Sequence, residues 1–189
     1  MNKLEFDLLQ KIYSPIIKSI IESNARFYRT NKTIHWCLGL EESSAIMGSC
    51  NRKTNIVTIN VEAVYESYRR GEPLQVEYFI LHEIRHIYQH LEVEDYKKDP
   101  SLCNNSELAK QWYEEEQNYV RALDVNENEN EQYFLQDMEL DAYAYAYAVM
   151  LYKYGKEKLS YLYMPRVYDS EVFLEIIDEW IRTFTKEGL

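Results

Sequence analysis

Apolar side chains recur at helical spacing through the first 30 residues. The pattern is carried by the leucines and isoleucines at positions 4, 8, 9, 12, 16, 17, 20 and 21. It is broken at Ser14 and Pro15, where a serine can cap one helix and a proline can begin the next. Residues 1–30 are therefore predicted to form N-terminal helices, arranged as a helical hairpin or as one kinked helix.

Residues 32–60 change to short segments rich in β-branched and aromatic side chains. The three segments read TIHWCLG, SAIMGSC and NIVTINV, and the polar sequence NRKT separates the last two. Such segments between turn residues are typical of strands. We predict a small antiparallel sheet, followed by a helix that Asn60 caps and Gly71 ends.

The rest of the chain is predicted to be mainly helical. Helical apolar spacing returns at 74–92, at 132–154 and at 170–185, and the stretch between the first two, 93–131, is polar and acidic enough to be an insertion. Tyrosine and alanine alternate with strand period inside 132–154, but alanine content, length and a terminal glycine favour a helix. The chain is thus predicted to be a single α+β domain, residues 1–189, with its small antiparallel sheet packed beside helix 74–92.

Composition narrows the classes of partner. A chain of 189 residues can bury a core without a stapling metal, so a metal site here would be functional. The net charge of -11 repels nucleic acid and acidic membranes and favours a basic protein partner. Glu5 and Asp7 interrupt the apolar run of a signal peptide, and no run of 18 apolar residues occurs. We expect a cytoplasmic protein with three reduced cysteines that serve in packing.

The sequence YFILHEIRHIYQH, residues 78–90, holds the strongest chemical signal. His82 and His86 are four residues apart, so on a helix their rings share one face, about 6 Å apart, and can converge on one zinc ion. Glu83 can project toward the open coordination position and accept a proton from water there. H-E-x-x-H is the zinc-hydrolase signature for this reason.

The chance frequency of the motif and the residues that flank it bear on this interpretation. H-E-x-x-H arises by chance in about one chain in a hundred of this composition, and the alternative is a surface helix with coincidental histidines. Apolar neighbours such as Ile80 and Ile84 favour a buried helix whose histidines face a cleft. His90 would lie about 12 Å from His82 along the axis and is interpreted as a bystander.

A catalytic zinc ion needs a third protein ligand, and carboxylates in three segments are candidates. The segments YEEEQ and NENENE read as a solvated helix face and a loop, whereas MELDAYA lies on the predicted helix 132–154. A carboxylate among apolar residues is unexpected unless it has a partner. Glu139 is the predicted ligand. Asp141 is predicted to orient a ligating histidine by accepting its second N–H, with an exposed surface charge as the alternative.

These residues carry a resemblance to a known family. FILHEIRHIYQH followed by ELDAYAYAVM resembles the ImmA/IrrE family of gluzincin-type metallopeptidases, and NIVTINVEAVY resembles the strand that precedes its active site. The resemblance covers about half of the chain, roughly 55–150. It implies a zincin-like fold in which His82, His86 and Glu139 bind one zinc ion and Glu83 is the general base. Leu140 and Tyr143 depart from the family pattern.

The predicted function is a zinc-dependent metallopeptidase that hydrolyses a protein or peptide with zinc-activated water. The resemblance suggests regulatory cleavage of a DNA-binding repressor. Peptide binding by strand addition at the sheet edge would suit such a site. The alternative is a non-catalytic zincin-fold protein that binds a partner or senses metal. Candidate donors to the oxyanion stay open: His35, Tyr143, Tyr163, Arg166 and Tyr168.

Overall fold

The computed structural model describes residues 1–30, 32–41, 46–121, 130–162 and 170–189. The chain begins with α1 (Lys3–Ser23), which Asn2 and Glu5 close with a reciprocal capping box. Pro15 lies inside this helix rather than at the start of a second one, so the helical-hairpin alternative is not formed. The buried face of α1, including Ile17, offsets the hydrogen bond that proline cannot make. A short 3-10 turn, η1 (Ala25–Phe27), follows.

The sheet has three strands: β1 (His35–Gly39), β2 (Gly48–Asn51) and β3 (Ile56–Asn60). Their order is β1-β3-β2, with β2 antiparallel and β1 parallel to β3. The prediction of an antiparallel sheet was therefore wrong for β1. The tight turn before Asn55, whose φ is 52°, reverses the chain only between β2 and β3. β3 becomes the central strand because it carries the buried positions Val57 and Ile59.

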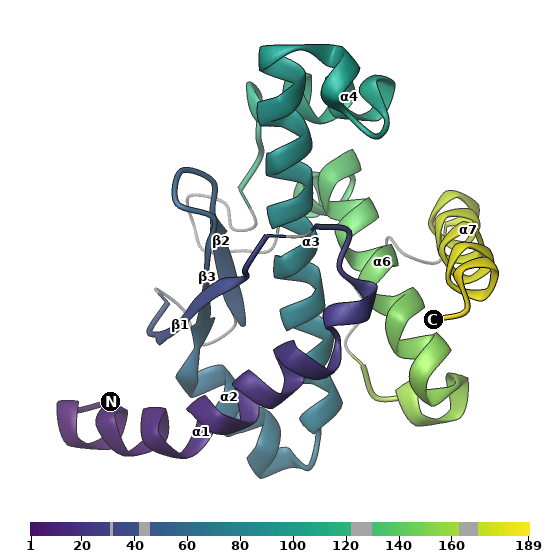
Figure 1. Cartoon of the computed structure of the whole chain (residues 1–189). Helices are drawn as coiled ribbons and strands as arrows, with labels where there is room; N and C mark the ends of the chain where they lie inside the picture. Colours follow the sequence, from purple (N-terminus) through teal and green to yellow (C-terminus); the bar gives the residue numbers. More distant parts are fainter. Residues whose placement is uncertain (31, 42–45, 122–129, 163–169) are drawn as a thin grey trace.

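Two helices follow the sheet. α2 (Val61–Arg70) begins at the predicted Asn60 cap and ends at Gly71, which has the left-handed φ of 77° that glycine tolerates. α3 (Pro73–Lys98) starts with proline in its first turn and runs six residues beyond the predicted end at residue 92. It is buried on almost every side, because the sheet lies on one side and α6 (Asp137–Tyr154) on the other (Figure 1).

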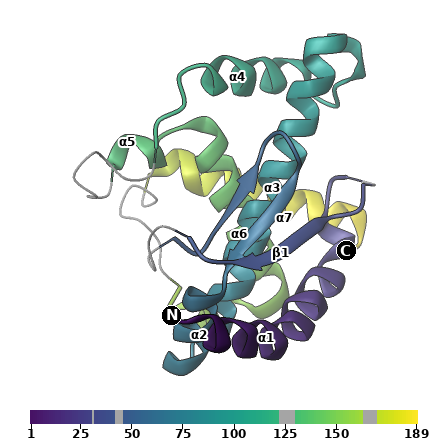
Figure 2. The same cartoon turned by 90° about the vertical axis from the view of Figure 1, so that its left-hand side faces the viewer.

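The insertion that follows α3 contains η2 (Pro100–Leu102) and α4 (Ser106–Glu116). α4 is capped by Asn105 and packs against the C-terminal half of α3, across the end of the molecule in Figure 2. Trp112 fills this contact and is almost completely buried. Residues 122–129, a further part of the acidic insertion, lie outside the described residues.

The C-terminal part is helical as predicted, with one interruption. The expected helix 132–154 is divided into α5 (Glu131–Phe134) and α6, and the break falls at Leu135 and Gln136. The alternating tyrosines and alanines of α6 form a helix because that helix is buried all round. After η3 (Lys156–Leu159), Ser170 caps α7 (Glu171–Glu187), which packs on the outer side of α6.

Among the described residues, a small apolar cluster of Val93, Trp112 and Met138 joins α3 to α4 and α6. Two larger apolar cores flank α3. One joins α3 with α6 and α7 around Tyr78, Tyr145 and Phe184, and the other joins α3 with α1, α2 and the sheet around Ile17 and Val57. The fold is mainly helical with a small mixed sheet, which confirms the α+β class. None of the helices in the described residues is long and apolar enough to cross a membrane.

Candidate metal centre

His82, His86 and Glu139 meet between α3 and α6. The two histidine Nε2 atoms are 3.0 Å apart, as their separation by one helical turn predicts. Glu139 reaches them from α6, with Oε2 3.4 Å from His82 Nε2 and Oε1 3.5 Å from His86 Nε2. One ligand atom from each residue lies within 4.8 Å of the others, and all three residues are buried. This group could hold a metal ion.

The hydrogen bonds around His86 show that its Nε2 can serve as a ligand. The Gln89 side-chain nitrogen donates to the Met138 carbonyl oxygen at 2.9 Å and to Asp141 Oδ2 at 2.8 Å. That orientation leaves Gln89 Oε1 as the acceptor 2.7 Å from His86 Nδ1, which must carry the proton. A neutral His86 therefore turns the lone pair of Nε2 toward His82 and Glu139.

Glu139 gives a second indication that a cation fits here. Its side chain is fully buried, and Oε2 has no hydrogen-bond partner. An ionised carboxylate is costly to bury unless it is paired or binds a metal. Burial opposes ionisation, but the charge of a protonated His86 and the nearness of both histidine rings keep the pKa of Glu139 well below its usual range. The donor set thus fits a divalent cation.

The histidines and Glu83 titrate differently because their surroundings differ. Burial, aided by the charge of His86, lowers the pKa of His82 to about 4. For His86, burial is outweighed by Glu139, which raises the pKa to about 9, so a metal ion must displace a proton from this ring. Burial raises the pKa of Glu83 to about 7. Its Oε1 lies 3.9 Å from His82 Nε2, and a carboxylate with such a pKa can exchange a proton near neutral pH.

Asp141 acts on His86 through Gln89. The predicted direct contact between Asp141 and a histidine N–H is replaced by the Gln89 side chain, which bonds to both residues. Arg85 fixes Asp141 with hydrogen bonds of 2.7 and 3.2 Å. Asp141 is buried, so the alternative of an exposed surface charge does not hold. The resulting chain of contacts runs from Arg85 through Asp141 and Gln89 to His86.

Tyr119 is a site residue that the sequence did not indicate. Its hydroxyl donates to Glu139 Oε1 at 2.7 Å. Tyr119 is partly exposed as a whole, but desolvation of its hydroxyl beside the buried Glu139 raises the pKa of Tyr119, so the hydroxyl stays protonated and remains a donor. The adjacent Val120 is held by two hydrogen bonds to the Gln136 side chain, of 2.7 and 3.1 Å. The segment after α4 is thereby fixed over the site, a contact that no local sequence pattern signals.

A cavity of about 290 Å³ opens beside the group. Glu83 and His86 line it, and β2 forms one wall. Gly48 brings β2 close, because a Cβ there would lie 2.7 Å from the Thr58 carbonyl oxygen and 3.5 Å from Glu83 Cγ. His90 also lines the cavity, with Nδ1 3.8 Å from Cys50 Sγ, and lies outside the three-residue group, as interpreted from the sequence.

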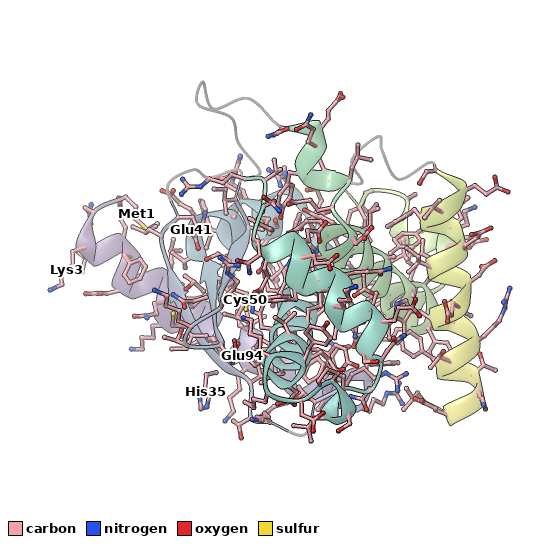
Figure 3. All side chains as sticks on the ribbon, turned by 90° about the horizontal axis from the view of Figure 1, so that it is seen from above. Met1, Lys3, His35, Glu41, Cys50 and Glu94 are labelled. Atoms are coloured by element: carbon pink, nitrogen blue, oxygen red, sulfur yellow. The ribbon has the colours of Figure 1, made fainter. Side chains whose placement is uncertain are left out.

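Of the candidate oxyanion donors that the structure describes, Tyr143 lies beside a histidine of the group and His35 does not. His35 is exposed at the start of β1 and projects away from the body of the protein in Figure 3, and β3 separates its strand from β2, which lines the cavity. Tyr143 is buried and packs on His82, with ring centroids 3.9 Å apart. Tyr163, Arg166 and Tyr168 lie outside the described residues.

The comparisons with known proteins do not add a family. No family model matches the chain, and no curated protein or solved structure matches it significantly. The resemblance to ImmA/IrrE peptidases therefore rests on the motifs in the sequence. The structure supports the coarser conclusion, a mainly helical protein with a buried His82, His86 and Glu139 group of the H-E-x-x-H type.

Proposed function

We propose that this protein is a zinc-dependent metallopeptidase. The observation that carries the proposal is the convergence of His82, His86 and Glu139 beside Glu83 at the wall of a cavity. Two imidazoles and a carboxylate are a typical catalytic zinc set, which leaves a position open for water or substrate. Metal-assisted hydrolysis also needs a base beside the metal, and Glu83 is a buried carboxylate whose pKa lies near neutral pH.

The roles of the residues follow from their positions. His82, His86 and Glu139 would hold the zinc ion, which when bound polarises a carbonyl group and acidifies water. Glu83 accepts the proton of the attacking water on its carboxylate and passes it to the leaving amine. Gln89 fixes the ring of His86, and the Tyr119 hydroxyl fixes Glu139.

We propose a protein or peptide as the substrate. β2 is an edge strand of the sheet and lines the cavity, so an extended peptide could pair with it and pass Glu83. The net charge of -11 favours a basic protein, and the resemblance to ImmA/IrrE peptidases suggests a DNA-binding repressor. The protein itself would not bind nucleic acid.

Replacement of Glu83 by glutamine tests the proposal. Glu83→Gln keeps the shape but removes the base, so cleavage of a quenched fluorescent peptide library should fall by about 10²- to 10⁴-fold. Zinc content should stay the same. Glu94→Gln is the matched control, since Glu94 lies on the same helix and is 55% exposed (Figure 3).

The same experiment separates the peptidase from a non-catalytic zinc protein. If zinc-loaded wild-type protein cleaves no peptide, or if Glu83→Gln cleaves as fast as wild type, the peptidase proposal fails. Binding of zinc or of a partner that survives without any turnover would then favour the non-catalytic alternative.

A further inference from the structure

One wall of the cavity holds two arginines together with the acid Glu116, although the chain as a whole is acidic. Arg52 and Arg121 both line this cavity, on the turn after β2 and on the segment after α4. The sequence has 21 basic and 32 acidic residues. Two arginines from separate segments therefore lie at one cavity in a chain that has an excess of acidic residues.

Glu116, which also lines the cavity, is shared between Arg52 and Lys97. Glu116 Oε2 lies 3.9 Å from Arg52 Nη1 and 3.5 Å from Lys97 Nζ, so one carboxylate faces two cations. The Arg52 side chain remains 52% exposed, whereas Glu116 is 9% exposed. Within the part of the chain that the structure describes, Arg121 takes part in no ion pair. The wall thus keeps guanidinium groups that can still bind an anion.

We propose that this wall selects substrates by binding a carboxylate. The inference rests on the proposed function, because it names the substrate class of the same site. A guanidinium presents paired N–H donors that match the two oxygens of a carboxylate. The carboxylate comes from an aspartate or glutamate side chain, or from the C-terminus of the peptide.

The geometry of β2 sets the distance between this carboxylate and the cleaved bond. Gly48 on β2 lies against Glu83, and Arg52 follows four residues later. At about 3.3 Å per residue, Gly48 and Asn51 are about 10 Å apart along β2, and Arg52 lies one residue further, in the turn after the strand. A peptide paired with β2 would therefore place its carboxylate three or four residues from the scissile bond.

Binding of defined peptides tests the proposal without relying on turnover. The probes are dye-labelled eight-residue peptides of mixed sequence and amidated C-terminus, with Glu, Gln or Lys fixed at one position. Their affinity for zinc-loaded Glu83→Gln protein is measured by fluorescence anisotropy. The Glu peptides should bind about tenfold more tightly than the Gln peptides, because the ion pair is charge-assisted and only partly screened. A Gln series with free C-termini distinguishes a terminal carboxylate from a side chain.

Arginine variants then locate the preference. Arg121→Gln and Arg52→Gln, each in the Glu83→Gln background, should reduce the Glu preference toward unity and leave the affinity for Gln peptides within about twofold. Arg121→Glu should turn the preference toward Lys. Arg182→Gln is the control, since Arg182 is exposed on the distant helix α7 and the charge change is the same.

The outcomes are separable from those of the peptidase test. Equal binding of Glu and Gln peptides, or a Glu preference that survives both arginine substitutions, overturns the proposal. Carboxylate-dependent binding by a protein that never cleaves peptides supports the inferred recognition and refutes only the peptidase function. Cleavage by wild type with no carboxylate preference supports the peptidase function and refutes the inferred recognition.

Discussion

Replacing Gln89 by leucine should lower both the free energy of unfolding and the affinity for metal. The Gln89 side chain is fully buried and bonds to His86, Asp141 and the Met138 carbonyl oxygen. Leucine fills a similar volume but makes none of these bonds. At about 1 kcal/mol for each of three hydrogen bonds, the free energy of unfolding should fall by about 3 kcal/mol. A domain of ordinary stability survives this loss.

The effect on metal binding follows from the freed His86 ring. Without its Nδ1 partner the ring can rotate, and loss of such an orienting contact typically weakens metal affinity by about 10- to 100-fold. Urea unfolding gives the stability, and competition with a chromophoric chelator gives the zinc affinity. Gln111→Leu is the control, because Gln111 is exposed on α4. If Gln89→Leu matches this control in both measurements, the proposed role of Gln89 is refuted.

Three further predictions address neighbouring features. Tyr119→Phe should weaken zinc binding by about tenfold, since Glu139 loses an orienting donor. Tyr65→Phe, at an exposed tyrosine on α2, should leave the zinc affinity unchanged, and equal affinities of the two variants in the chelator competition would contradict the prediction. A chelator should lower the melting temperature by about 8 °C relative to protein with zinc at a hundred times its Kd, because bound zinc stabilises the folded state. In the same calorimetry, Glu139→Gln protein should show a smaller difference in melting temperature between zinc and chelator. Burial and then the charge of Glu83 raise the pKa of Cys50, so its thiolate is scarce at pH 8. Mass spectrometry should show iodoacetamide modifying the half-buried Cys50 about tenfold more slowly than the exposed Cys37, and similar rates would contradict the prediction.

The parts of the fold that the sequence predicted depend on local patterns. The Asn60 cap, the Gly71 stop and the spacing of His82 and His86 lie within one or two turns of the helices that they define. The predicted helix 132–154 was close to α6 because alanine and length outweighed the alternating pattern. Local spacing also explains why Glu139 could be proposed, as a carboxylate among apolar residues of one helix.

The parts that the sequence did not predict depend on distant contacts. The parallel pairing of β1 with β3 is a tertiary choice, since the residues of either strand would fit either direction. Tyr119 reaches Glu139 from an irregular segment, and Arg85 meets Asp141 from the neighbouring helix. Gln89 had a readable signal, because it lies three residues after His86 on one helix face, but many glutamines have that spacing without a metal nearby.

The most direct test of the account is the zinc content of the purified protein. Elemental mass spectrometry on protein prepared without a histidine tag or chelator should find about one zinc ion per chain, as a site with three protein ligands predicts. Glu139→Gln and His86→Ala proteins that remain folded should contain much less. Wild-type protein that is metal-free and takes up no added zinc would contradict the account, because the convergence of His82, His86 and Glu139 would then have another cause.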